Sequence, residues 1–286
     1  MKVLLIGANC QGNGIAELIK RNPYISTNFK VIVKPNYSEF VTETEELNRL
    51  FPTVDIYVYQ PISSERFHYN IDFLKKNLLK KDCVLISFPV LYFTGYWPDF
   101  SSRKAGLSNK MLPYVHNKLE DLSHKYGRDN PEEIIKAARD PCLFSKEECI
   151  KNMEDTLAEL RRREETIDIK SSDFIEQNYF KERLFHTVNH PSNKLLLFVT
   201  NKILERMGLN PIQEVGMAEY LAGHQMLIYP SVMNHLGLQF IEENSLIDFC
   251  SNHLYKNEFG DCPNRVSIEE YIRQFIRIFY TSLDNT

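Results

Sequence analysis

The sequence lacks the patterns that mark several common classes of protein. Its six cysteines contain no Cys-x-x-Cys pair, so neither a disulfide framework nor a zinc site is predicted. No apolar run approaches the roughly eighteen residues of a membrane span, and the N-terminal apolar run is too short for a signal peptide. These absences predict a cytoplasmic protein with free thiols and without a membrane span.

A large excess of charge is also missing. The 286 residues carry a formal net charge of −4, and the run Arg161-Arg162-Arg163 is balanced by the two glutamates that follow it. This distribution gives no basic footprint for nucleic acid and predicts a solvated helix face instead. Because 43% of the residues are hydrophobic, the chain is long and apolar enough to bury a core.

Strand-like and helix-like patterns alternate in the first ninety residues. Strands are predicted at 2–7, 29–34, 54–60 and 82–87, with helices near 12–21, 39–50 and 66–80 between them. This alternation is typical of a parallel sheet covered by helices. The fold class predicted is therefore α/β, with an N-terminal Rossmann-like parallel sheet flanked by helices and a largely helical C-terminal half.

The second half of the chain has mainly helical periodicity. Helices are predicted at 109–126, 131–139, 145–166, 172–182, 191–207 and 267–283, and a short extended segment at 184–188. Two of them begin with a capping box, in which Ser145 precedes Glu148 and Ser267 precedes Glu270. We expect one α/β domain over 1–286, with a parallel-sheet core at 1–105 and a mainly helical elaboration at 106–286 that carries His190.

A cysteine stands at the first turn between strand and helix. Cys10 lies between Asn9 and Gln11, after a buried strand and before an amphipathic helix. Ligands of open α/β sheets bind at such turns, and the N–H groups of a helix N-terminus favour an anion. The helix dipole supplies only roughly 0.3–1 kcal/mol, so a thiol with a pKa near 8.5 still needs a base. A buried, inert thiol is the alternative for Cys10.

The glycines of this turn match no complete nucleotide motif. The dinucleotide pattern G-x-G-x-x-G is incomplete because Asn9 stands where its second glycine belongs, and no Lys-Ser/Thr pair follows Gly12, as a P-loop would require. A nicotinamide or P-loop site is therefore not predicted.

An aromatic loop follows the fourth strand. Residues 88–99 contain two prolines and one glycine, which exclude a regular helix. The loop is either a structural cover over the sheet edge or a wall for a flat, sugar-like ligand. In the second case Tyr96 and Asp99 would supply polar contacts.

A histidine-rich turn provides the base that Cys10 requires. Pro191 suits the first turn of the helix at 191–207, which places His190 at its N-cap or just before it. Thr187 occupies the glutamate position of H-E-x-x-H, so no metal is predicted at His186 and His190. We predict that Cys10 and one of these histidines form a nucleophile and base pair, distant in sequence and adjacent in space.

At this point the chain resembles the WcbI-like capsular polysaccharide biosynthesis proteins, a family of coenzyme A-dependent acetyltransferases. Four segments carry the resemblance over roughly the first two thirds of the chain: Asn9-Cys10-Gln11, Tyr59-Gln60-Pro61, Phe93-x-Gly95-Tyr96-x-Pro98 and Thr187-x-Asn189-His190-Pro191. Ala8 departs from the glycine that commonly precedes Asn-Cys-Gln in the family.

The resemblance implies acetyl transfer from acetyl-CoA to a saccharide hydroxyl, with Cys10 and His190 as the catalytic residues. His190 would remove a proton from Cys10, giving an acetyl-thioester enzyme, or from the sugar hydroxyl in a direct transfer. The remaining predicted site residues share polar or phosphate-binding roles. Those for the oxyanion or substrate are Asn9, Gln11, Gln60, Tyr96 and Asn189, and those for coenzyme A are Gly12 and Lys194, with Lys34, Arg103 and Lys104 as further basic candidates.

Two other functions stay open from the sequence. One is an SGNH-like esterase or deacetylase, in which Cys10 replaces the serine and water replaces the sugar. The other is a binding protein that holds a nucleotide or sugar without chemistry. Oligomeric state, acceptor sugar and acyl chain are not encoded in any pattern of the sequence.

Overall fold

The computed structural model describes residues 1–100, 114, 116–213, 216, 218–223, 225–240, 247–248 and 265–284. The chain divides into two compact units. The first comprises residues 1–92, 159–176 and 191–221, and the second comprises residues 93–158, 177–190 and 222–286. One domain over 1–286, with a sheet core at 1–105 and a helical elaboration at 106–286, stays a prediction.

A four-stranded parallel sheet forms the centre of the first unit, in the order β2-β1-β3-β4. The strands are β1 (Lys2–Ala8), β2 (Phe29–Pro35), β3 (Ile56–Tyr59) and β4 (Val84–Ser87). All four lie where the alternating pattern predicted them, and their parallel pairing confirms the α/β fold with a Rossmann-like sheet.

Side chains of β1 alternate between two apolar layers. Leu5 packs into a buried cluster on one face of the sheet, together with Phe40, Phe51 and Tyr57. Its neighbour Ile6 points to the opposite face, toward the first helix. Because successive residues of a strand point to opposite faces, one short apolar run supplies both layers of the core.

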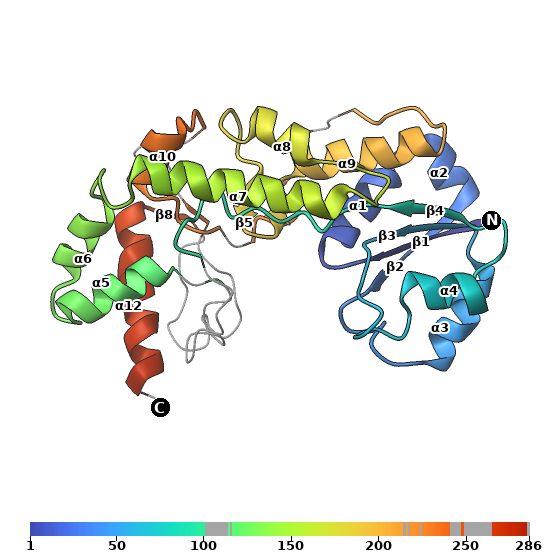
Figure 1. Ribbon diagram of the computed structural model, residues 1–286, viewed down its shortest axis with the longest axis horizontal. Helices are drawn as coiled ribbons and strands as arrows, with labels where there is room; N and C mark the ends of the chain where they lie inside the picture. The colour runs from blue at the N-terminus through green and yellow to red at the C-terminus, as the bar shows by residue number, and fades with distance from the viewer. Residues whose placement is uncertain are drawn as a thin grey trace. The chain divides into compact units, whose positions relative to one another are not determined.

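Helices cover both faces of this sheet (Figure 1). The helices that lie wholly in the first unit are α1 (Gln11–Ile19), α2 (Pro23–Asn28), α3 (Glu45–Leu50), α4 (Ile71–Asn77) and α9 (Asn193–Arg206), with a 3₁₀ turn, η1 (Phe51–Thr53). In Figure 1, α3 and α4 lie on one side of the sheet, and α1 and α9 lie on the other.

Two contacts show that α1 and α9 run side by side in the same direction. Near their first turns, a Cβ on Gly14 would lie 2.7 Å from Leu196 Cδ1, so glycine permits this close approach. Beyond their last turns, Asn22 Nδ2 donates to Asn210 O at 2.9 Å. The N-termini of α1 and α9 therefore lie at the same end of the helix pair.

Three helices are shorter than their periodicity predicted. The prediction of 39–50 contracts to α3, 66–80 contracts to α4, and 172–182 contracts to α8 (Ser172–Asn178). Polar caps set the new starts of α3 and α4, where Thr44 Oγ1 accepts from Leu47 N and Asn70 Oδ1 accepts from Phe73 N. A local cap thus overrides apolar spacing that continues beyond the helix.

The described part of the second unit is mainly helical, as predicted for the C-terminal half. It contains α5 (Asn117–Tyr126), α6 (Pro131–Ala138), α10 (Pro230–Leu236), α12 (Ile268–Asp284) and the first part of α7 (Lys146–Glu164). Short strands accompany them: β5 (Phe185–Thr187), β6 (His190–Pro191), β7 (Ile247–Asp248) and β8 (Arg265–Val266). The start predicted for α5, at 109, lies outside the described residues.

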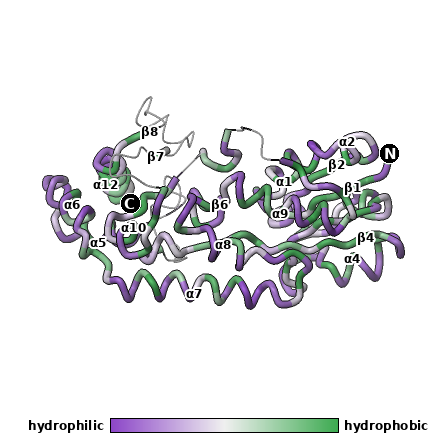
Figure 2. Tube along the Cα trace, turned by 90° about the horizontal axis from the view of Figure 1, so that it is seen from above, coloured by the Kyte–Doolittle hydropathy of each residue, from purple (hydrophilic) through white to green (hydrophobic). Residues whose placement is uncertain are grey.

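Both predicted capping boxes stand at helix starts. Glu148 N donates to Ser145 Oγ at 3.1 Å, and Ser145 N donates to Glu148 Oε2 at 2.7 Å, which is the complete reciprocal arrangement. At α12, Glu270 N donates to Ser267 Oγ at 3.2 Å. Figure 2 shows hydrophilic and apolar residues alternating along α7, as expected of a helix with one solvated face.

No helix among the described residues is both long and apolar enough to span a bilayer.

Candidate functional site

Cys10 is the N-cap residue of α1, at the carboxyl edge of the parallel sheet. The turn that holds it is closed by Asn9: Asn9 Oδ1 accepts from Gln11 N at 3.0 Å, and Asn9 O accepts from Gly12 N at 2.9 Å. These bonds satisfy two N–H groups that a helix start otherwise leaves unpaired. The Cys10 side chain is half-buried.

A network of buried side-chain amides supports this turn from below. Gln60, which follows β3, accepts from Asn9 N through Oε1 at 2.9 Å. Its Nε2 donates to Gln11 Oε1 at 2.9 Å and to Pro89 O at 3.3 Å. Gln11 in turn exchanges two hydrogen bonds with the backbone of Leu91, at 2.8 and 3.1 Å. The network ties together the ends of β1, β3 and β4.

This network changes the roles available to the two glutamines. Gln11 is fully buried and Gln60 is 2% exposed. Both amide protons of Gln60 are donated inside the protein, so none is left for an oxyanion. Gln60 and Gln11 position the turn, whereas Asn9 is half-buried and its Nδ2 donates to none of the residues that the structure describes. Asn9 therefore stays the best-placed side-chain donor beside Cys10.

The protein environment acts on the Cys10 thiol in two opposing ways. Burial raises the pKa of Cys10 above its usual value, while the backbone N–H groups of Cys10 and Gln11 lower it. Burial is the larger influence, so the pKa is raised overall. The thiol is thus protonated at neutral pH, and a nucleophilic role needs a base, as the sequence predicted.

The residues predicted to hold coenzyme A have different surroundings. A Cβ on Gly12 would lie 2.9 Å from Ala8 Cβ, so this glycine lets α1 approach the sheet, and its N–H already donates to Asn9 O. Lys34 forms ion pairs with Glu39 and Glu46, at 3.0 and 2.7 Å. Neither residue is therefore available to a phosphate in this arrangement.

Lys194 keeps a suitable position. It is the second residue of α9, at the end where α9 lies beside the first turns of α1. Glu219 Oε2 accepts from the neighbouring Asn193 N at 2.7 Å, so a carboxylate already lies at this helix start. The two other basic candidates, Arg103 and Lys104, lie outside the described residues.

Helix α9 begins two residues later than predicted, which leaves His190 before the N-cap, the second of the two positions predicted. His190 does not cap α9, because Ser192 is the N-cap and its Oγ accepts from Leu195 N at 3.5 Å. His190 and Pro191 instead form β6, which pairs with β5. The serine hydroxyl can accept a hydrogen bond from an N–H group of the first helical turn. The proline side chain has no such acceptor, so it cannot cap the helix.

Three polar side chains of the second unit meet around His190. Tyr114 donates through its hydroxyl to Asn189 Oδ1 at 2.7 Å. The Tyr114 hydroxyl oxygen also lies 3.2 Å from His190 Nε2. Thr187 Oγ1 also donates to Asn189 Oδ1, at 3.2 Å. The phenol of Tyr114 thus contacts the Nε2 side of the His190 ring, and no sequence pattern singled out this tyrosine.

The His190 ring is poised as a neutral base. Burial lowers its pKa below the usual value, and the nearby His186 lowers it further. At neutral pH the imidazole is therefore unprotonated and able to accept a proton. His186 is 4% exposed and belongs to β5, whereas His190 is half-buried. The greater exposure of the residue as a whole favours His190 over His186 as the base, although its Nδ1 atom is itself buried.

The aromatic loop is a core element. Tyr96 and Trp97 are fully buried, with the Tyr96 hydroxyl donating to Tyr179 O at 2.6 Å and Trp97 Nε1 donating to Leu227 O at 2.9 Å. Asp99 Oδ2 accepts from Tyr229 Oη at 2.9 Å. The Tyr96 hydroxyl and Asp99 Oδ2 are thus engaged inside the protein, which favours the structural interpretation of this loop.

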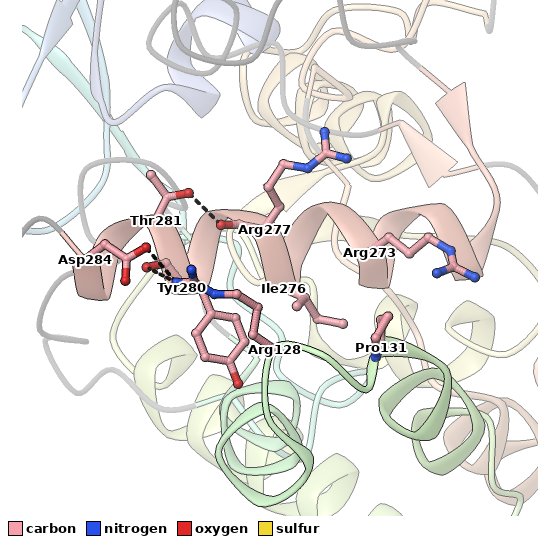
Figure 3. Close-up of a pocket in the computed structure, with 8 residues that line it drawn as sticks. All are labelled: Arg128, Pro131, Arg273, Ile276, Arg277, Tyr280, Thr281 and Asp284. Carbon is pink, nitrogen blue, oxygen red and sulfur yellow. Dashed lines mark hydrogen bonds and ion pairs between the residues drawn. The ribbon is translucent and has the colours of Figure 1, made fainter.

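A pocket of about 360 Å³ lies elsewhere in the second unit, between α12 and the start of α6 (Figure 3). Arg128 lines it and donates to Tyr280 O at 3.3 Å and to Asp284 Oδ2 at 2.6 Å. Arg273, at its other end, donates to Glu132 at 2.6 Å. Two of its arginines are thus neutralised by acidic partners, and the pocket contains none of the predicted site residues.

The carboxylate of Asp168 links β4 to α9, which no sequence pattern predicted. Asp168 Oδ2 accepts from Ser87 Oγ at 2.7 Å and from Ser87 N at 2.9 Å, and Asp168 Oδ1 accepts from Arg206 at 2.6 Å. These bonds lower the pKa of Asp168 although burial opposes the shift. They fasten the end of β4 to α9, and no spacing in the sequence joins residues 87, 168 and 206.

Within the described residues, no three histidine, cysteine, aspartate or glutamate side chains gather closely enough to hold a metal ion.

Comparison with known families identifies the class of protein. The family model described as "Polysaccharide biosynthesis enzyme WcbI" matches residues 3–212. This match covers more than half of the chain, including the sheet, the Cys10 turn and the His190 turn. The chain therefore belongs to the WcbI family of polysaccharide biosynthesis enzymes.

A solved structure of WcbI has a similar fold, with a TM-score of 0.75 and 19% sequence identity over 99% of this chain and 92% of that chain. It is the native form of that protein without a disulfide bond between coenzyme A and one of its cysteines. At this identity the likeness shows the fold alone. No curated protein matches the chain.

Proposed function

We propose that this protein is an acyltransferase that moves an acetyl group from acetyl-CoA to a saccharide hydroxyl, with Cys10 as the nucleophile and His190 as the base. The observation that carries the proposal is the half-buried thiol at the start of α1, in a chain of a polysaccharide biosynthesis family. Cys10 lies where α/β enzymes place reacting groups, and its neighbouring N–H groups favour a negative sulfur.

Coenzyme A as the donor is supported by the relative. The solved WcbI structure is a native form without a disulfide bond between coenzyme A and a cysteine near the N-terminus of that chain. Cys10 is the cysteine nearest the N-terminus here, since the next is Cys83. We assign Lys194 as a contact for a phosphate of coenzyme A, because it lies at the end of α9 that accompanies the first turns of α1.

The proposed reaction has two acyl transfers. His190 takes the proton from the Cys10 thiol, and the sulfur attacks the carbonyl carbon of acetyl-CoA. Asn9 Nδ2 stabilises the tetrahedral oxyanion, after which the bond to the sulfur of coenzyme A breaks and that sulfur takes the proton from His190. The sugar hydroxyl then gives its proton to His190 and attacks the acetyl-Cys10 thioester, the bond to the Cys10 sulfur breaks, and that sulfur takes the proton from His190.

The alternatives differ from this reaction in measurable ways. A direct transfer gives no acetylated Cys10, an SGNH-like esterase releases free acetate without any sugar, and a binding protein produces no turnover.

Two measurements on the full chain separate these functions. Isothermal titration with coenzyme A should give saturable binding by wild type and by Cys10→Ser. Incubation with acetyl-CoA and no acceptor should add one acetyl group to the Cys10 peptide, detected by mass spectrometry. Cys142→Ser is the matched control, because Cys142 is exposed and its loss should leave acetylation unchanged. Absence of coenzyme A binding would overturn the proposal.

A further inference from the structure

The hydroxyl of Tyr114 lies between two polar side chains of the His190 turn. It is 2.7 Å from Asn189 Oδ1, to which it donates, and 3.2 Å from His190 Nε2. The two rings meet edge to face, with centroids 5.6 Å apart and an angle of 74° between their planes. The phenol therefore fixes both the position and the hydrogen bonding of the imidazole.

Counting protons assigns the direction of each hydrogen bond. A phenol has one proton, and here that proton is donated to Asn189 Oδ1, a carbonyl oxygen that can only accept. Thr187 Oγ1 donates to the same oxygen, which is consistent with this orientation of the amide. Toward His190 the phenolic oxygen can then only accept, so Nε2 must carry the proton of that hydrogen bond.

The other ring nitrogen has the complementary character. A neutral imidazole carries one N–H group, so an Nε2–H form leaves the lone pair on Nδ1. Nδ1 is buried and has no hydrogen-bond partner among the described residues. The ring is kept neutral by burial and by His186, so the Nδ1 lone pair is available at neutral pH.

We propose that Tyr114 is a positioning residue that holds His190 in the Nε2–H tautomer and thereby makes Nδ1 the atom that accepts the proton. Asn189 determines the direction of the hydrogen bond between Tyr114 and His190, because its carbonyl oxygen accepts the phenolic proton. The catalytic use of Nδ1 rests on the proposed acyl transfer, whereas the tautomer itself does not.

Two substitutions should act on the tautomer in different ways. Tyr114→Phe removes the oxygen that accepts from Nε2–H, so the preference for one tautomer should be lost. Asn189→Ala removes the acceptor of the phenolic proton, so the hydroxyl should turn and donate to Nε2, which shifts the proton to Nδ1. Tyr126→Phe is the matched control, because Tyr126 lies in α5 of the same unit and its ring contacts Lys125.

The tautomer can be measured directly by two-dimensional ¹⁵N–¹H correlation of the imidazole nitrogens in the full chain labelled at histidine. The His190 signals are identified by their loss in His190→Gln. Wild type and Tyr126→Phe should show a protonated Nε2 and an unprotonated Nδ1, and Asn189→Ala should show the reverse. A protonated Nδ1 in wild type, or an unchanged tautomer in both Tyr114→Phe and Asn189→Ala, would overturn the proposal.

Kinetics then tests the catalytic part separately. Tyr114→Phe should slow acetylation of Cys10 roughly 10- to 100-fold with little change in the affinity for coenzyme A, since the base is misdirected and the donor site is intact. If the tautomer is as predicted and no acetylation occurs in wild type, the proposed function fails and the tautomer assignment stands. If acetylation occurs with a protonated Nδ1, the tautomer assignment fails alone.

Discussion

Burial shifts the pKa values of Cys10 and His190 in opposite directions, although the two turns that hold these residues are built differently. In the first unit, Cys10 stands on a network of buried amides and backbone groups, and burial keeps the thiol protonated. In the second unit, His190 is held by side-chain hydroxyl and amide groups, and burial keeps the imidazole neutral. The same desolvation therefore leaves an acid with its proton and a base without one.

This contrast explains why the proposed pair needs both members. A thiol with a raised pKa is a weak nucleophile alone, and a histidine with a lowered pKa is a free proton acceptor at neutral pH. The pairing of Cys10 with His190 stays a proposal that kinetics must test.

Loss of the sulfur should have the largest effect on activity. Cys10→Ser should reduce acyl transfer from acetyl-CoA by at least about a thousandfold, because removal of a nucleophile eliminates the covalent route. Circular dichroism and thermal unfolding should match wild type, since the isosteric hydroxyl keeps the packing of the turn. Retention of wild-type turnover by this variant would remove Cys10 from the mechanism.

Loss of the amide network should have the next largest effect, on stability. Gln60→Ala removes the hydrogen-bond partner of Asn9 N and of Pro89 O, whereas Gln11 Oε1 keeps its bond from Leu91 N. The free energy of unfolding should fall by about 2–3 kcal/mol, since each buried group left unsatisfied costs about 1–3 kcal/mol and the network relaxes in part. Denaturant titration measures this.

Gln177→Ala is the matched control for the network, because this glutamine is exposed. Its free energy of unfolding should stay within about 0.5 kcal/mol of wild type. Equal stability of Gln60→Ala and Gln177→Ala would show that the Cys10 turn does not depend on the amide network.

The smallest expected effect concerns the phosphate contact. Lys194→Ala should weaken coenzyme A binding about five-fold, which is the loss of roughly 1 kcal/mol from a half-exposed charge pair. Lys202→Ala is the control on the same helix, because Lys202 pairs with Glu205 two turns further along α9. Isothermal titration should separate the two variants at low salt, and identical affinities would exclude Lys194 as a phosphate contact.

The regular elements were predictable where local chemistry determines them. The four strands follow from short apolar runs, and the capping boxes at Ser145 and Ser267 follow from a serine three residues before a glutamate. Helix α9 shows the limit of this approach, since Pro191 suggested its start and the Ser192 hydroxyl determines it. Local patterns thus located elements better than they located helix ends.

The sequence located the two turns of the candidate site and not the contacts that support them. Residue types and turns singled out Cys10 and His190, whose roles stay predictions. The buried contacts of Gln60 with Gln11 and of Tyr114 with Asn189 join residues 49 and 75 positions apart. Such pairs depend on how the chain folds over long distances, so no local spacing reveals them. For the same reason Tyr96, expected at a ligand, proved to be a core residue.

The pH dependence of Cys10 acetylation by acetyl-CoA tests the central claim most directly, in wild type and in His190→Ala. In wild type, the rate should rise with pH at a midpoint below about 6.5, the usual pKa of histidine, because neutral His190 is the base and its pKa is lowered. In His190→Ala this rise should vanish, and acetylation should increase only as the Cys10 thiol ionises, above its usual pKa. An unchanged acidic midpoint in His190→Ala would contradict the pairing of Cys10 with His190.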